Sequence, residues 1–377
     1  CAAPVKVSAQ RTAKNFARAI VVNSGNANAC TGKQGIVDAN RMTEIAGKSL
    51  SIKNSDVLVC STGRIGVPMP MKNVARGIRA CVPLLARSAS NARQVAEAIM
   101  TTDRRRKEIA VKFRIGKSTV RIGGICKGAG MIEPGMATGH ATMLAFITSD
   151  VAIESNLLKR ALKIAVQQSF NRITVDGDMS TNDSVIMLAN GLAGNKKIQH
   201  RTPKAFPSRQ SIEQRIFQDA LNFITLELAK MVVRDGEGAS RFVKLHVHGG
   251  RSTGEAEAAA RSIANSSLVR TSWCGGDPNW GRILCALGQS NARVDGTIVD
   301  VGYARPSARE IVFAFRRGRP TNTALKRLAK ITSAAQFDLY VDLHLGSGEF
   351  TLYASDLTEN YVALNKGDVN DPATLGG

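Results

Sequence analysis

A glycine-rich segment that leads into an apolar segment is the feature that most constrains the fold of this chain. The sequence KGAGMIEP (127–134) continues through GMATGHA (135–141) into TMLAFI (142–147). Glycine and proline disfavour regular structure, whereas the short apolar run predicts a buried strand. A flexible approach therefore delivers a small residue and then a threonine to the start of a strand, which is the layout of a self-cleaving peptide bond.

Such a bond breaks when the threonine hydroxyl attacks the carbonyl carbon of the preceding alanine. Cleavage leaves the threonine with a free α-amine beside its own hydroxyl, so the nucleophile carries its own base. The unperturbed pKa of an α-amine, roughly 7.7–8.0, suits a base near neutral pH. Two pairs fit this layout, Ala137-Thr138 and Ala141-Thr142. The alternative is that these threonines are purely structural.

Strand and helix signals alternate along the rest of the chain. Apolar runs and alternation predict strands at 18–23, 57–60, 143–148, 242–247, 298–303, 310–315, 338–345 and 349–354, and a hairpin within 111–125. Helical periodicity predicts helices at 35–50, 155–172, 211–233 and 255–266, two more within 72–100, and one beginning at 277. Because the two types interleave, we expect an α/β fold built as an α+β layered sandwich.

Composition excludes several classes of protein. No stretch approaches roughly 18 consecutive apolar residues, so we expect no membrane helix, and the N-terminal residues lack the plan of a secretory signal. The 7 cysteines contain no CxxC pair, which argues against a disulfide scaffold or a zinc cage and favours a reducing compartment. His246 and His248 share one face of a predicted strand, but no third ligand has a recognisable spacing, so no metal is expected.

The formal net charge of +21 draws anionic partners toward the surface. Its densest runs are RRRK (104–107) and RRGR (316–319), yet aromatic residues make up only 5% and no nucleic-acid-binding motif is present. We therefore interpret these runs as solvated basic faces and expect no nucleic-acid partner.

Acyl transfer also needs groups that stabilise an oxyanion and hold a substrate. Thr62-Gly63 lies at a strand end, where a hydroxyl and an inward N–H would form an oxyanion hole worth about 3–4 kcal/mol per donor. Lys127 is a candidate for holding a carboxylate, and Glu237 for an ammonium group. The alternatives are a simple turn at residue 62 and solvated side chains at the other two positions.

Eight ordered segments resemble the ornithine acetyltransferase family, the ArgJ-type glutamate N-acetyltransferases, from residue 1 to about 365. They are NSGNANACTG (23–32), STGRIG (61–66), IMTTD (99–103), KGAGMIEP (127–134), ATMLAFITSD (141–150), NRITVDGDMSTNDS (171–184), DGEGA (235–239) and DPNWGRI (277–283). By motif, Thr62 and Gly63 resemble the family's oxyanion pair. Its substrate-binding positions are resembled by Thr101, Lys127, Glu237 and Asn365.

The resemblance implies a precursor that cuts itself at an Ala-Thr bond and assembles as an α2β2 heterotetramer. It implies a threonine that takes acetyl from N-acetylornithine and passes it to glutamate through an acetyl-threonine intermediate, with no dissociable cofactor. Bifunctional members also accept acetyl-CoA, a candidate co-substrate here. The expected location is cytoplasmic, or the mitochondrial matrix or a plastid in a eukaryote.

The sequence departs from the family pattern at the cut site, because the family has a single Ala-Thr pair. Counting from Lys127 selects Thr138, whereas the following apolar strand selects Thr142. We favour Thr142, since the strand after the nucleophile fixes its position while the upstream end can move once cut. The expected chains are then residues 1–141, shortened at the N-terminus relative to the family, and residues 142–377.

The end of the chain also departs from the family. Asn365 is followed by KGDVNDP (366–372) in place of the usual Asn-x-x-Tyr-Thr-Thr, so the terminal hydroxyl has no counterpart. Two rival hypotheses stay open beside an acetyltransferase. One is a self-processed amidohydrolase or aminopeptidase that uses the same threonine, and the other is an uncleaved, inactive homologue.

Overall fold

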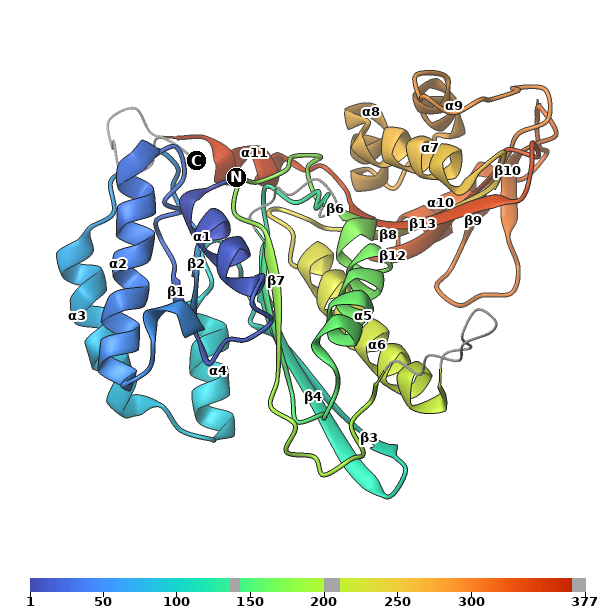
Figure 1. Cartoon of the computed structure of the whole chain (residues 1–377). Helices are drawn as coiled ribbons and strands as arrows, with labels where there is room; N and C mark the ends of the chain where they lie inside the picture. Colours follow the sequence, from blue (N-terminus) through green and yellow to red (C-terminus); the bar gives the residue numbers. More distant parts are fainter. Residues whose placement is uncertain (136–142, 200–210, 368–377) are drawn as a thin grey trace.

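The computed structural model describes residues 1–135, 143–199 and 211–367, and it interleaves helices with strands (Figure 1). The helices are α1 (Ala3–Thr12), α2 (Gly32–Leu50), α3 (Met71–Cys81), α4 (Ala89–Ala98), α5 (Ser155–Gln167), α6 (Ile212–Arg234), α7 (Thr253–Asn265), α8 (Ser267–Cys274), α9 (Trp280–Gly288), α10 (Leu325–Thr332) and α11 (Glu359–Asn365). The strands are β1 (Ala19–Asn23), β2 (Val57–Ser61), β3 (Lys107–Ile115), β4 (Ser118–Lys127), β5 (Leu144–Ser149), β6 (Ile173–Thr174), β7 (Ser184–Ala189), β8 (Phe242–Gly250), β9 (Asp300–Ala304), β10 (Val312–Arg316), β11 (Arg319–Pro320), β12 (Gln336–Asp342) and β13 (Gly348–Ser355).

The described strands form three sheets. β1 and β2 make a parallel pair, and a 4-stranded sheet has the order β3-β4-β5-β7. A 7-stranded sheet has the order β11-β10-β9-β12-β8-β13-β6. In the 4-stranded sheet β4 pairs antiparallel with β5, and β5 pairs parallel with β7. The predicted layered α/β fold is therefore confirmed.

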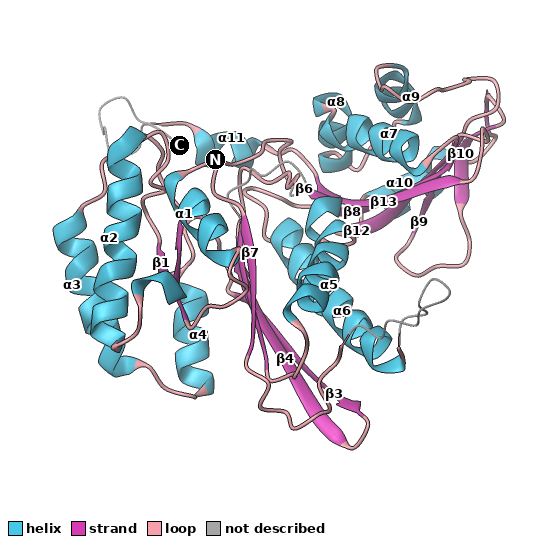
Figure 2. Cartoon of the chain, viewed as in Figure 1, coloured by secondary structure: helices cyan, strands magenta, loops and turns pink. Residues whose placement is uncertain are grey.

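Helices α5 and α6 lie between the two larger sheets, and α7 to α10 cover the outer face of the 7-stranded sheet (Figure 2). The inner core joins Ile122 of β4 and Ile147 of β5 to Leu228 of α6, all about fully buried. Helix α6 approaches β4 closely at Gly124, where a Cβ would lie 2.9 Å from the Leu228 side chain. Burying a leucine or isoleucine contributes roughly 1.5–3 kcal/mol each, so this core fixes the sheet that carries the glycine-rich segment.

The β1–β2 pair packs against the face of the 4-stranded sheet opposite to α5 and α6. Cys60 of β2 contacts a small apolar cluster with Leu144 and Phe146 of β5, and Ile20 and Val22 of β1 lie against it. Helices α1, α2 and α3 lie on the other side of the pair (Figure 1). This packing brings the C-terminal end of β2 beside the start of β5.

Local sequence explains where several elements begin and end. Gly116, at the tip of the β3–β4 hairpin, has a φ of +59°, a conformation that glycine adopts without strain. Ser211 and Gln214 form a reciprocal capping box at the start of α6. The helix expected at 155–172 ends earlier, at Gln167, because the backbone of Ser169 leaves helical geometry (φ −133°, ψ −87°) and the chain turns into a short 3₁₀ segment at 170–172.

Two expectations drawn from composition, one about the cysteines and one about membrane helices, can be compared with the structure. No disulfide joins the cysteines of the described ranges, which are Cys1, Cys30, Cys60, Cys81, Cys126, Cys274 and Cys285. Over the described ranges, none of the helices combines the length and the apolar character that crossing a membrane requires.

Candidate active site

Two of the candidate residues, Lys127 and Thr62, lie at the ends of strands. Lys127 is the last residue of β4 and pairs with Leu144, the first residue of β5. Thr62 follows directly on β2, and its N–H donates to Asn23 O at the end of the parallel neighbour β1. The ends of β1, β2 and β4 therefore meet where β5 begins, although they come from distant parts of the sequence.

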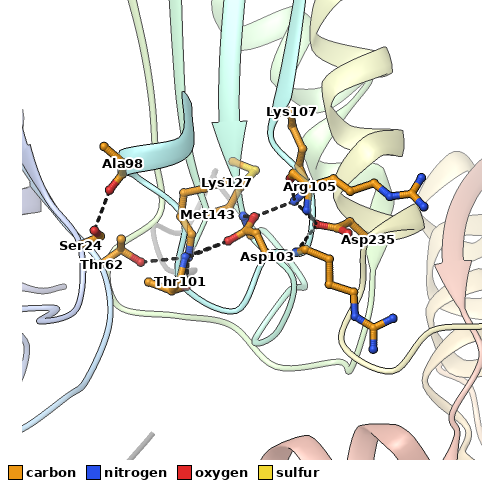
Figure 3. Close-up of polar contacts among 12 residues, drawn as sticks. Ser24, Thr62, Ala98, Thr101, Asp103, Arg105, Lys107, Lys127, Met143 and Asp235 are labelled. Carbon is orange, nitrogen blue, oxygen red and sulfur yellow. Dashed lines mark hydrogen bonds and ion pairs between the residues drawn. The ribbon is translucent and has the colours of Figure 1, made fainter. Parts of the chain in front are cut away.

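Lys127 is the centre of this site. Its side chain is 1% exposed, and its Nζ donates to Thr101 Oγ1 at 2.7 Å and to Thr62 Oγ1 at 3.2 Å (Figure 3). The structure thus brings together three residues that the sequence named separately. The alternative of a solvated lysine in a glycine-rich loop is wrong, because the ammonium group lies among polar partners inside the protein.

The loop that carries Thr62 and Gly63 is held by close backbone packing. Gly63 has a φ of +123°, and a Cβ there would lie 2.3 Å from the carbonyl carbon of Gly25. Only glycine fits this approach of two chain segments. Thr62 itself is fully buried, and its hydroxyl accepts from Lys127, which leaves the hydroxyl proton available to an oxyanion.

A buried ion cluster lies behind Lys127. Asp103 Oδ2 lies 3.9 Å from Lys127 Nζ, and Asp103 Oδ1 lies 2.6 Å from Lys107 Nζ. Lys107 Nζ also lies 2.6 Å from Asp235 Oδ2 (Figure 3). The basic run at 104–107 was interpreted as a solvated face, and for Lys107 that is wrong, because its side chain points inward from β3 to these carboxylates.

Burial and charge act in opposite directions on these groups. Burial lowers the pKa of Lys127, and Asp103 opposes that shift by stabilising the ammonium form. Burial alone would raise the pKa of Asp103, but the neighbouring ammonium groups of Lys107 and Lys127 more than offset it, so this pKa is lowered. Asp103 is thus held as a carboxylate inside the protein.

Asp183 fixes the start of β5. It precedes β7, and its Oδ1 accepts the N–H of Met143, the residue immediately before that strand. Its Oδ2 is buried and has no hydrogen-bond partner in the described part of the chain. Burial raises the pKa of Asp183 well above its ordinary value, although the Met143 N–H and Lys127 oppose the shift. Asp183 was not predicted, although it belongs to the segment NRITVDGDMSTNDS (171–184) and directly precedes β7.

Glu237 lies on the other side of the glycine-rich segment. Its N–H donates to Ala129 O at 2.8 Å, and a Cβ on Gly130 would lie 2.5 Å from its carboxylate. Asn365, at the end of α11, donates from Nδ2 to Glu237 Oε2 at 2.8 Å. The two predicted substrate-binding residues are therefore in contact. The negative charge of Glu237 also acts to raise the pKa of Lys127, against the effect of burial.

The predicted cut site lies outside the described residues. This applies to Thr138, Ala141 and Thr142, so their predicted roles stay predictions. The structure describes the chain again from Met143, whose N–H is held by Asp183. Asp103 and Asp235 were also not predicted, although each belongs to a segment on which the family resemblance rested. The available signal was an acidic residue two positions from a predicted site residue, Thr101 in one case and Glu237 in the other.

No metal centre is seen in the described ranges, where no cluster of three or more His, Cys, Asp or Glu is arranged to hold an ion. His246 and His248 do share one face of β8, as expected, with ring centroids 6.1 Å apart. His246 stacks on Tyr340 of β12 at 4.5 Å, so its ring is part of an aromatic cluster on the sheet.

This layered α/β fold brings hydroxyl, ammonium and carboxylate groups together at its strand ends, which are the kinds of group that enzymes acting on small polar molecules use. A family model described as the ArgJ family matches residues 1–367. The arginine biosynthesis bifunctional protein ArgJ of Symbiobacterium thermophilum is 43% identical over 364 residues, which cover 97% of this chain and 85% of that protein. The chain therefore belongs to the ArgJ family.

Further relatives agree with this assignment. The glutamate N-acetyltransferase of Methanocaldococcus jannaschii is 42% identical over 352 residues, which cover 92% of this chain and 83% of that protein. The crystal structure of the arginine biosynthesis bifunctional protein ArgJ from Bacillus halodurans is similar with a TM-score of 0.52 and 35% identity. The match covers 58% of this chain and 95% of the solved chain.

Proposed function

We propose that this chain is a glutamate N-acetyltransferase of arginine biosynthesis, which moves acetyl from N-acetylornithine to glutamate through Thr142. Family membership supports the reaction, because relatives that match most of the chain carry the names glutamate N-acetyltransferase and arginine biosynthesis bifunctional protein. The choice of Thr142 rests on the anchoring of Met143 by Asp183. In the sequence, Thr142 directly precedes Met143, whose N–H is held by Asp183 immediately before β5.

The proposed chemistry has two stages. In the first, the Thr142 hydroxyl attacks the Ala141 carbonyl, the peptide nitrogen leaves as the free α-amine, and water hydrolyses the resulting ester. In the second, that amine takes the hydroxyl proton while Oγ1 attacks the acetyl carbon of N-acetylornithine, and ornithine leaves with the proton. The amine of glutamate then attacks the acetyl ester, which releases N-acetylglutamate and restores the threonine.

The described residues have assigned roles in this proposal. The Thr62 hydroxyl and Gly63 N–H stabilise the oxyanion of each tetrahedral intermediate, and Lys127 polarises the Thr62 hydroxyl by donating to it. Glu237, oriented by Asn365, binds the side-chain ammonium of ornithine. Thr101 lies at the exposed edge of the site, where it holds the other side of Lys127. Acetyl-CoA as a second donor, an α2β2 assembly and a cytoplasmic location are further predictions.

Intact-mass analysis tests the proposal. The purified protein should run as two fragments, the second beginning at Thr142, and N-acetylornithine without glutamate should add one acetyl group to that fragment. Addition of glutamate should remove the label and yield N-acetylglutamate. Release of free acetate instead would favour the amidohydrolase, and a single unlabelled polypeptide would favour the inactive homologue.

A further inference from the structure

Lys107 is a buried cation that the proposed reaction does not use. Its side chain is 1% exposed, although its neighbours Arg104, Arg105 and Arg106 are exposed. Besides the two carboxylates at 2.6 Å, its Nζ contacts Arg105 O at 3.2 Å. Burying an ammonium group is costly unless it is paired, so this position is specified by its partners.

The two lysines share one carboxylate, but unequally. Asp103 Oδ1 lies 2.6 Å from Lys107 Nζ, whereas Asp103 Oδ2 lies 3.9 Å from Lys127 Nζ. Lys127 is therefore beyond hydrogen-bond distance of Asp103 and donates to the threonine hydroxyls instead. Asp103 also accepts the N–H groups of Gly128 at 2.7 Å and Thr101 at 3.1 Å, which holds the carboxylate in place.

Charge balance indicates what Lys107 does. With both lysines present, the ammonium groups of Lys107 and Lys127 match the carboxylates of Asp103 and Asp235. Without Lys107, the carboxylate of Asp103 would keep Lys127 as its nearest cation. In a poorly solvated site that attraction is strong, and the flexible lysine stem would let Nζ close the gap to Asp103.

We propose that Lys107 is a positioning residue for the acetyl transfer: by neutralising Asp103 it keeps Lys127 on the hydroxyls of Thr62 and Thr101. The inference rests on the proposed function, because it assigns Lys107 a part in that reaction. Lys107 touches no substrate and acts through Lys127. Its second partner, Asp235, accepts the N–H groups of Arg104 and Arg105, and it stands two residues before Glu237 in the chain.

The test compares Lys107→Met with two double variants. For each variant, kcat and KM for N-acetylornithine are measured on the cleaved fraction of the protein. Lys107→Met should lose about tenfold or more in kcat/KM, because Lys127 leaves Thr62. Adding Asp103→Asn removes the competing carboxylate, and kcat/KM should return to within about threefold of the wild type. Adding Asp235→Asn instead is the matched control, which neutralises the other carboxylate and should restore nothing.

Three results would overturn the inference. One is a Lys107→Met enzyme within about twofold of the wild type. Another is a folded, cleaved Lys107→Met/Asp103→Asn enzyme no better than the single variant. The third is failure to fold of both Lys107→Met and Lys107→Gln, which would assign Lys107 to stability alone. The wild type is assayed alongside, and its inability to transfer acetyl would instead refute the proposed function.

Discussion

The carboxylate of Asp183 accepts the backbone N–H of Met143, and the Ser184 N–H donates to Met143 O at 2.9 Å, so two hydrogen bonds tie the start of β7 to the start of β5. Because β5 and β7 are parallel neighbours, the bonds lie at the end of the sheet where both strands begin. The chain that emerges from the cut-site region is therefore fixed from its first described residue. Oδ2 of the same carboxyl group is buried and has no hydrogen-bond partner among the described residues, and burial raises the pKa of the group, so its protonation links protein stability to pH.

Asp183→Asn should change how stability depends on pH. The pKa of Asp183 is raised above 3.8 in the folded protein, so above that pH the folded state binds more protons than the unfolded state. The free energy of unfolding then falls as pH rises from about 4 toward the folded pKa. The asparagine variant lacks this loss, so its Tm relative to the wild type should increase with pH. Calorimetry from acid to neutral pH checks this, with the exposed Asp219→Asn as control.

Thr142→Ala should abolish cleavage, and Thr138→Ala should leave it intact. The reason is position in the sequence: Thr142 directly precedes Met143, whose N–H is held by Asp183, whereas Thr138 stands four residues further upstream. Gel electrophoresis and N-terminal sequencing of the fragments decide the matter. The reverse pattern would transfer the nucleophile to Thr138.

Thr62→Ala should lower kcat by about 100- to 1000-fold, because it removes one donor from the proposed oxyanion hole. Thr62→Ser keeps the hydroxyl that Lys127 contacts and is the matched control, with activity close to the wild type. Steady-state kinetics on the cleaved enzyme provide the measurement. Equal losses in both variants would show that the methyl group, rather than the hydroxyl, matters.

Glu237→Gln should raise the KM for N-acetylornithine by about tenfold with a smaller effect on kcat, because a charge-assisted contact to the substrate ammonium is lost. The amide keeps an oxygen that Asn365 can reach, so the packing over Gly130 is preserved. Acetyl-CoA, if accepted as donor, lacks that ammonium group and supplies the internal comparison. An unchanged KM for N-acetylornithine contradicts the assigned role.

Gly63→Ala should destabilise the protein and remove activity. The φ of +123° alone costs a non-glycine residue about 1–3 kcal/mol, and the new Cβ would lie 2.3 Å from the backbone of Gly25. The Gly66→Ala variant, also at positive φ but with no atom within 4 Å of its Cβ, separates conformational strain from the clash. Thermal unfolding should show a clearly lower Tm for Gly63→Ala than for Gly66→Ala.

The fold could be predicted well where a single element carries its own pattern. The alternation and Gly116 of the 111–125 hairpin, and the short apolar run before Thr62, are local signals, and the structure confirms both. Helix α1 was missed because its sequence, APVKVSAQRT, is a poor helix former. Tertiary contacts decide there: the Ser8 hydroxyl donates to Val59 O and accepts from Val59 N–H on β2.

The site was predictable residue by residue but not as an arrangement. Thr62, Lys127 and Glu237 each came from a motif, yet nothing in the spacing says that Lys127 donates to Thr62. The prediction of a solvated basic face at 104–107 was the clearest error, because charge patterning does not distinguish Lys107 from its exposed neighbours. Its burial depends on two carboxylates, one of them 128 residues away in sequence.

The antiparallel pairing of β4 with β5 has a consequence for the proposed cleavage. β4 precedes the predicted cut and β5 follows it, and their ladder runs from Lys127↔Leu144 to Ile122↔Ser149. Scission between them would leave the two products sharing one sheet and one apolar core, so neither could dissociate without unfolding the other. The mature enzyme would then be a permanent complex made from a single gene product, and denaturation should be hard to reverse once its halves drift apart.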